Sequence, residues 1–320
     1  MKPTKPAPEA AGPHPRNRHQ GRYNLPALSG ALPELRQWIV QRRGDSTVDF
    51  SDQRAVLALN RALLAHWYRV RGWELPAAAL CPGVPGRADL IHYLADLLAS
   101  DHGGKLQRGP SVRVLDIGVG ASAVYPLIGA GEYGWSFVGV DVSLAALDSA
   151  KCILAANPTM AASIELRRQY DAQHIFDGVI GKDEHFDLSL CNPPFHLSAR
   201  AVKQASVDKW RKLGKATREG ARGSNFGGMA LELHCAGGEL GFISRMIEES
   251  VRHQQSVRWF SSLVSKAAHV PTLRKSLHAA GATDIRQIEM GQGQKLSRVL
   301  AWTFQEGGKR EAAPKGCEST

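Results

Sequence analysis

The run Asn192-Pro193-Pro194-Phe195 places an amide, two prolines and an aromatic ring directly after the apolar alternation of residues 186–190. The prolines fix their own backbone and restrict the residue before each, so the run predicts a stiff loop at a strand end. The Asn192 amide oxygen and the Pro193 carbonyl can accept both hydrogens of an exocyclic amine on a nucleobase. Such contacts turn the amine lone pair out of the ring plane, toward an electrophilic methyl group. Phe195 can stack on a base that has left its duplex.

A second pattern joins Gly118-x-Gly120, at the end of one apolar stretch, to Asp141 at the end of the next. A glycine turn that opens a helix lets backbone approach a ligand closely, and an acid placed this way accepts both hydroxyls of a ribose. The expected cofactor therefore contains a nucleoside. Gly118, Gly120 and Ala123 also fit the G-x-G-x-x-A dinucleotide pattern, so an NAD enzyme is an alternative. A tight strand-to-helix turn with Asp141 as a helix cap is another.

Apolar spacing predicts the elements that position these loops. Helical spacing covers residues 32–43, 52–71 and 87–100, and from residue 112 onward strands alternate with helices. The expected strands are residues 112–118, 135–142, 163–169, 186–191, 257–264, 283–291 and 297–304. This alternation predicts an α/β fold with a mainly parallel seven-stranded sheet, one antiparallel edge and an N-terminal helical extension.

Composition sets the limits of the chain. With 320 residues, 43% of them hydrophobic, it is long enough to bury a sizeable core. The ends, residues 1–13 and 306–320, are rich in Pro, Ala, Gly and charge and are expected to be disordered tails around an extension at 14–104 and a catalytic domain at 105–305. The five cysteines form no C-x-x-C pair, and no stretch has the length or apolarity of a membrane span or signal peptide. The expected location is the cytoplasm, and no metal site is indicated.

The charge balance favours a polyanionic partner. The net charge is +10, and basic residues concentrate in an arm at 14–24 and an insert at 200–222. Either segment alone is typical of a solvated surface, but two of them, one beside the proline loop, point to phosphate contacts. The candidate RNA contacts are Arg16, Asn17, Arg18, His19 and Arg22 in the arm and Arg211 and Lys212 in the insert.

Several stretches in order resemble one known family. They are HPRNRH, DIGVGASAVYPLIGA, GWSFVGVD, LCNPPFH, NFGG, GGELGFISRMIEES and GQGQKLSRVLAWTF, between residues 14 and 305. The chain resembles the bacterial 23S rRNA adenine N6-methyltransferases, which are related to the METTL16-type RNA methyltransferases of eukaryotes. These are class I S-adenosylmethionine-dependent enzymes, whose amino-methylating members carry [DNS]-P-P-[FYW].

The resemblance implies roles for individual residues. The predicted cofactor contacts are Arg87 with the methionine carboxylate, Asp116, Gly118, Gly120 and Ala121 in the cofactor loop, Asp141 with the ribose, Asp171 on the adenine side, and Asn192. The catalytic loop is Asn192 with Pro193, Pro194 and Phe195. Tyr170 stands where the family leads us to expect Lys.

The function that follows is N6-methylation of one adenine in 23S rRNA, either free or in an assembling subunit, with S-adenosylmethionine as donor, no metal and no obligate protein partner. Two alternatives remain. One is an N-methyltransferase that acts on DNA adenine or protein glutamine through the same tetrapeptide. The other is a non-catalytic RNA-binding protein with a vestigial fold, which would be expected to have lost Asp141 or Asn192.

Overall fold

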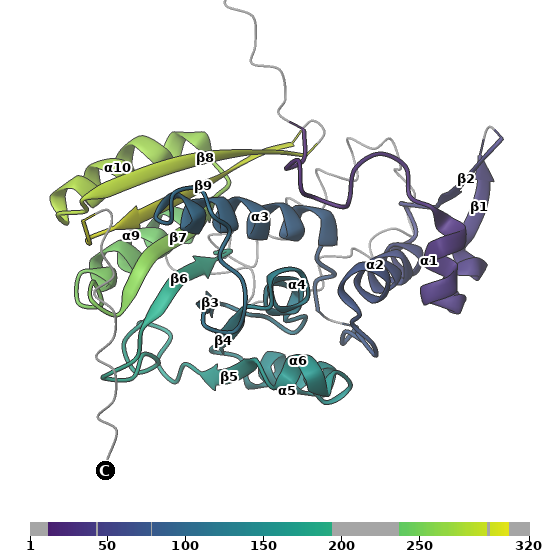
Figure 1. The fold of residues 1–320 in the computed structure, drawn as a ribbon, viewed down its shortest axis with the longest axis horizontal. Helices are drawn as coiled ribbons and strands as arrows, with labels where there is room; N and C mark the ends of the chain where they lie inside the picture. Colours follow the sequence, from purple (N-terminus) through teal and green to yellow (C-terminus); the bar gives the residue numbers. More distant parts are fainter. Residues whose placement is uncertain (1–11, 43, 78, 194–236, 293–294, 307–320) are drawn as a thin grey trace, which may run out of the picture.

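The computed structural model describes residues 12–42, 44–77, 79–193, 237–292 and 295–306 (Figure 1). The described residues form a seven-stranded sheet and, at the N-terminal end, a separate two-stranded hairpin. In Figure 1 this N-terminal part, with α1 (Leu25–Ala31), β1 (Ile39–Arg42) and β2 (Asp45–Val48), lies at one end of the molecule. The end remote from it holds α10 (Val270–Ala279), β8 (Asp284–Gln292) and β9 (Lys295–Thr303).

The strands of the large sheet lie in the order β5-β4-β3-β6-β7-β9-β8. Their bounds are β3 Arg113–Ile117, β4 Ser136–Asp141, β5 Ile164–Arg168, β6 Phe186–Cys191, β7 Val257–Val264, β8 Asp284–Gln292 and β9 Lys295–Thr303. The strands from β3 to β7 are parallel, and β9 pairs antiparallel with both β7 and β8. This confirms the predicted α/β class and its mainly parallel seven-stranded sheet.

Helices cover both faces of this sheet, and α1 packs on α2 at the N-terminal end. Their bounds are α1 Leu25–Ala31, α2 Gln53–Tyr68, α3 Val84–Ser100, α4 Val124–Tyr133, α5 Leu144–Ala155, α6 Pro158–Ala161, α9 Gly238–Ser250 and α10 Val270–Ala279. Alternate strand residues point to opposite faces. Val114 therefore packs in a cluster with α2 to α5, whereas Leu115 packs in a second cluster with α9 and α10.

The N-terminal extension shares its core with the sheet. Leu63 of α2 and Trp73 beyond it belong to the same cluster as Val114 of β3. The helix predicted over 32–43 is wrong. A 3-10 turn, Pro33–Trp38, is followed there by β1, Ile39–Arg42, which pairs with β2, Asp45–Val48. The apolar spacing was too short to distinguish a helix from a turn and strand.

Within the described residues, no helix is long and apolar enough to cross a membrane.

Candidate active site

Three strand ends meet where the strand order reverses. Ile117, the last residue of β3, is paired with Val140 of β4 on one side and Cys191 of β6 on the other. Asn192, which follows Cys191, therefore lies beside the glycine turn that follows β3, and Asp141 lies on the other side of that turn, all at the carboxyl ends of these strands. Open α/β sheets bind their ligands at this kind of switch point. The two sequence motifs are thus brought together.

The glycine turn beyond β3 leaves room above its backbone. Gly118 and Gly120 have φ values of 76° and 66°, which favour glycine. The N–H groups of Gly118 and Val119 donate to the Val140 carbonyl at 2.8 and 2.9 Å. A Cβ added to Gly118 would meet no atom within 4 Å in the described part of the chain. Another molecule can therefore approach this backbone closely.

Asp141 is held by that turn. Its Oδ2 accepts the Gly120 N–H and its Oδ1 accepts the Ser143 N–H, each at 2.9 Å. A carboxylate has about four acceptor positions, so each oxygen still has capacity for a ribose hydroxyl. Burial raises the pKa of Asp141. The cap of α5 is Ser143, whose hydroxyl accepts the Ala146 N–H, so the helix-cap alternative for Asp141 is wrong.

Asp116 and Arg87 contribute polar atoms without partners. Asp116 is completely buried in β3, and neither carboxylate oxygen has a hydrogen-bond partner among the residues described. Burial, and then the charge of Asp141, raise the pKa of Asp116 well above its ordinary value. Arg87, near the start of α3, has a buried Nε that is likewise unpaired within the described chain. Unpaired buried groups are rare in folded proteins and mark ligand sites or water sites.

Asn192 and Pro193 follow β6 directly. Pro193 is buried, and the Asn192 Oδ1 is a buried acceptor that no described residue satisfies. Pro194 and Phe195 lie outside the described residues, as does the basic insert with Arg211 and Lys212. Their predicted roles stay predictions.

The end of β5 borders Asp141, because the Gln169 N–H donates to the Asp141 carbonyl at 3.0 Å. Asp171 follows in an exposed loop, where its Oδ1 accepts the Gln173 N–H at 2.8 Å. Tyr170 is 83% exposed, and the Arg168 guanidinium lies over its ring at 5.0 Å. The residue that stands where Lys was expected is thus largely exposed, with Arg168 over one face of its ring.

The basic arm makes internal contacts. Arg16 donates to Asp96 at 2.7 Å and to the Tyr133 hydroxyl at 3.1 Å, and Arg18 donates to both carboxylate oxygens of Glu132 at 2.9 and 3.2 Å.

Asn17 and His19 are buried, so their side chains contact protein in this structure. Asn17 donates to Asp89, and the His19 Nε2 lies 3.0 Å from the Tyr68 hydroxyl. Arg22 pairs with Asp45 but its side chain is 83% exposed. The predicted RNA contacts of the arm stay predictions, with Arg22 as the arginine most open to solvent among the three.

Sequence reasoning missed two residues near the glycine turn. The Trp73 Nε1, from the loop after α2, donates to the Ser122 carbonyl at 2.9 Å and braces the turn from outside the sheet. Tyr125, in the first turn of α4, has a buried hydroxyl with no partner in the described ranges. No sequence signal could have found either, because both depend on contacts between distant segments.

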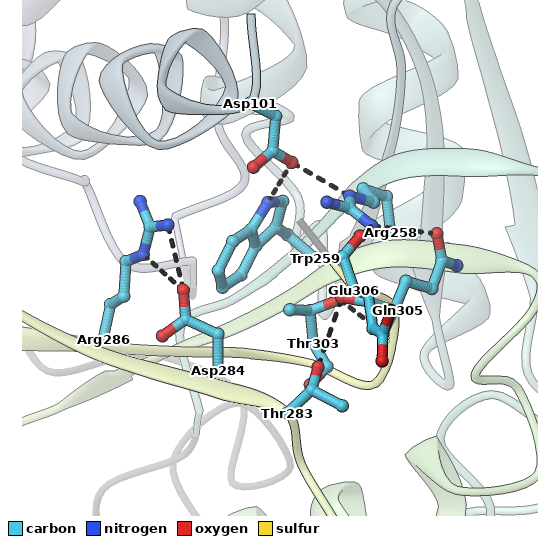
Figure 2. Close-up of a pocket in the computed structure, with 9 residues that line it drawn as sticks. All are labelled: Asp101, Arg258, Trp259, Thr283, Asp284, Arg286, Thr303, Gln305 and Glu306. Atoms are coloured by element: carbon cyan, nitrogen blue, oxygen red, sulfur yellow. Dashed lines mark hydrogen bonds and ion pairs between the residues drawn. The ribbon is translucent and has the colours of Figure 1, made fainter. Parts of the chain in front are cut away.

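A polar cavity of about 290 Å³ lies elsewhere, around Asp101, Arg258, Trp259 and Arg286 (Figure 2). Asp101 follows the last residue of α3, whereas Arg87 is near its start, so the two ends are roughly 20 Å apart at the helical rise. The Asp101 carboxylate accepts from Arg258 at 2.9 Å and from the Trp259 Nε1 at 2.8 Å. These groups satisfy one another, which is typical of a structural network.

A second polar cluster joins His174, Asp177 and Glu249. Glu249 already accepts backbone N–H groups from Ile175 and Phe176, and Asp177 already pairs with Arg252. The carboxylates are therefore occupied as protein hydrogen-bond acceptors.

Comparison with known proteins decides the family. A family model described as an RNA methyltransferase matches residues 7–306. The chain belongs to this RNA methyltransferase family. A Pseudomonas aeruginosa protein named ribosomal RNA large subunit methyltransferase F is 50% identical over 318 residues, which cover 97% of this chain and 95% of that relative. The protein of the same name from Serratia proteamaculans is 46% identical over 305 residues, 95% and 91% of the two chains.

Solved structures of the METTL16 methyltransferase are similar along most of the chain. The catalytic domain in complex with MAT2A 3′UTR hairpin 1 has a TM-score of 0.74 and 26% identity, and the match covers 94% of this chain and 100% of that one. The N-terminal domain of human METTL16 in complex with SAH has a TM-score of 0.71 and 25% identity, over 92% and 100% of the chains. Membership of the RNA methyltransferase family excludes the NAD enzyme that the glycine pattern left as an alternative.

Proposed function

We propose that this protein transfers a methyl group from S-adenosylmethionine to N6 of one adenine in large-subunit rRNA. The observation that carries the proposal is the Oδ1 of Asn192, which is buried with no partner among the described residues at the switch point, with β3 between it and Asp141. An acceptor in this position, next to a site suited to a nucleoside, fits the orientation of an exocyclic amine.

The residues present fit the proposed methyl donor, which carries its methyl on an electrophilic sulfonium. The open space at Gly118 admits a ligand against the backbone. Asp141 retains acceptor capacity for the ribose, and the Arg87 Nε, which no described residue pairs with, lies in a side chain suited to a carboxylate. The N-terminal domain of human METTL16, which has a similar fold, has been solved in complex with SAH, the molecule that remains when such a donor has lost its methyl group.

The chain's own groups orient the nucleophile. The Asn192 Oδ1 and the Pro193 carbonyl accept the two hydrogens of N6, so that its lone pair leaves conjugation and points at the methyl carbon. As the nitrogen becomes cationic in the transition state, both acceptors bind its hydrogens more strongly. The surplus proton leaves afterwards. Phe195 is proposed to stack on the extruded adenine.

The substrate assignment rests on the relatives. Two curated relatives, 50% and 46% identical over nearly the whole chain, are named for the large-subunit ribosomal RNA. The net charge of +10 suits an RNA partner. The proposal commits to a base in RNA, because a family of RNA methyltransferases makes DNA adenine and protein glutamine weaker candidates.

The test incubates the protein with methyl-labelled S-adenosylmethionine and rRNA from cells that lack it, followed by digestion and separation of nucleosides. We expect label in N6-methyladenosine at one large-subunit position, and about a hundredfold less of it with Asn192→Ala. Bare rRNA and assembling subunits are compared as substrates. Label in cytosine, DNA or protein glutamine would overturn the proposal. If no substrate were labelled, the alternative of a non-catalytic RNA-binding protein with a vestigial fold would be favoured instead.

A further inference from the structure

Tyr125 carries a polar group that the reaction described above does not use. It is the second residue of α4, is 4% exposed, and its hydroxyl oxygen is buried without a hydrogen-bond partner in the described part of the chain. A buried hydroxyl left without a partner destabilises the folded protein, so such a group calls for an explanation in a bound ligand or water.

The hydroxyl lies among other unsatisfied groups. Burial raises the pKa of Tyr125 to about 12, while the charges of Arg87 and Asp116 act on that pKa in opposite directions. The phenol is therefore a proton donor at neutral pH, with both side chains near it. The Arg87 Nε and both Asp116 oxygens lack partners among the residues described, as the Tyr125 hydroxyl does. Three elements, α3, β3 and α4, thus bring unpaired polar atoms to one place.

The chemistry of this set matches one end of the proposed cofactor. Arg87 and Tyr125 offer donors, which suit a carboxylate, whereas Asp116 offers an acceptor, which suits an ammonium group. An α-amino acid presents both charges on adjacent atoms. Neither the ribose nor the adenine of the donor carries such a pair.

We propose that the Tyr125 hydroxyl binds the amino-acid end of S-adenosylmethionine by donating a hydrogen bond to its carboxylate beside Arg87, which makes Tyr125 a positioning residue for the methyl donor. This inference rests on the proposed function. Holding the amino-acid chain limits rotation at the sulfur to which it is bonded, and so fixes the direction in which the methyl group points.

The experiment measures binding by calorimetry, with the full chain and S-adenosylhomocysteine as the probe. Tyr125→Phe is expected to weaken binding by about tenfold or more, the loss of one hydrogen bond to a charged group. Affinity for methylthioadenosine, which lacks the amino-acid end, should be the same in the variant and the wild type. A structural role of the ring would not separate the two ligands.

Thermal unfolding of the free protein supplies a second readout. Tyr125→Phe removes an unpaired buried hydroxyl, so its Tm should stay equal or rise. Tyr68→Phe is the matched control, since the Tyr68 hydroxyl is buried and lies 3.0 Å from the His19 Nε2. We expect that variant to lose thermal stability and to keep its affinity for S-adenosylhomocysteine.

The outcomes separate the two proposals. Wild-type protein that binds no S-adenosylhomocysteine would refute the proposed function, and this inference with it. Wild-type binding with unchanged affinity in Tyr125→Phe would refute the inference alone and assign the hydroxyl to a water. Equal weakening for both ligands would place the hydroxyl away from the amino-acid end.

Discussion

Two buried histidines make the packing of the N-terminal arm sensitive to acid. Burial, and then the charge of Arg18, lower the pKa of His19 to about 4. Burial, followed by the charges of His14 and Arg16, lowers the pKa of His92 to about 3. The His19 Nε2 lies 3.0 Å from the Tyr68 hydroxyl, and the His92 Nδ1 lies 2.7 Å from the Tyr133 hydroxyl. The folded protein therefore holds both rings neutral at pH 5.

The sign and size of the effect follow from linkage. In the unfolded chain both rings take up a proton below the ordinary value of 6.5, whereas the folded protein resists until about pH 4 for His19 and pH 3 for His92. The unfolded state thus binds more protons between these limits, and stability falls as the pH falls. From pH 7 to pH 5 each histidine should lower the free energy of unfolding by about 2 kcal/mol.

Chemical denaturation at pH 7 and pH 5 measures this loss. The buried carboxyl groups of Asp116 and Asp141, whose pKa values burial raises, change stability in the opposite direction, so variants are compared with the wild type. His19→Gln and His92→Gln should each remove about 2 kcal/mol of the pH-dependent loss, whatever their stability at pH 7. The exposed His66, replaced by Gln, is the control and should leave the loss unchanged. Equal losses in the wild type and both buried-site variants would refute the assignment.

The remaining predictions concern the site and the arm. Asp141→Asn keeps one side-chain oxygen that can accept a backbone N–H, but it should weaken S-adenosylhomocysteine binding about tenfold in calorimetry. Unchanged affinity would show that Asp141 does not bind the ribose. Asn192→Ala should keep that affinity but lower single-turnover methylation about a hundredfold, so near-normal turnover with saturating RNA would contradict the amine-orienting role. Arg16→Ala with Arg18→Ala should lower the free energy of unfolding by about 1–3 kcal/mol. If these arginines also contact phosphate, the log-log salt slope of RNA binding should fall by about one unit for each, whereas parallel slopes would leave them a structural role alone.

The sheet could be predicted from sequence because its strands are short apolar runs between clear helical patterns. The strands expected at 186–191 and 257–264 have these bounds in the structure. The meeting of the two motifs at the switch point could also be predicted, because the residues that follow neighbouring parallel strands lie at the same end of the sheet. The hairpin near Gly44 was missed because its strands are only four residues each, too short for a period to show.

The partners of charged and polar side chains could not be predicted from the sequence. The arm was interpreted as an RNA contact from its arginines, but Asp96 and Glu132, which accept from Arg16 and Arg18, lie 80 and 114 residues away along the chain. The Tyr125 hydroxyl likewise becomes buried, with no partner among the described residues, only once α3, α4 and β3 have packed together. Local composition reports how many charges a segment has, and the fold decides which of them are neutralised.

The arm and the cofactor site are linked through the same two helices. Arg16 donates to the His92 carbonyl and to Asp96 in the second half of α3, and to the hydroxyl of Tyr133, the last residue of α4, so it joins these two helices. The first turns of α3 and α4 carry Arg87 and Tyr125. Loss of the arm contacts could therefore lower cofactor affinity without any change in an RNA contact. Only the salt dependence of RNA binding reports phosphate contacts directly, and for that reason it, and not affinity alone, distinguishes an arm that touches RNA from one that supports the site.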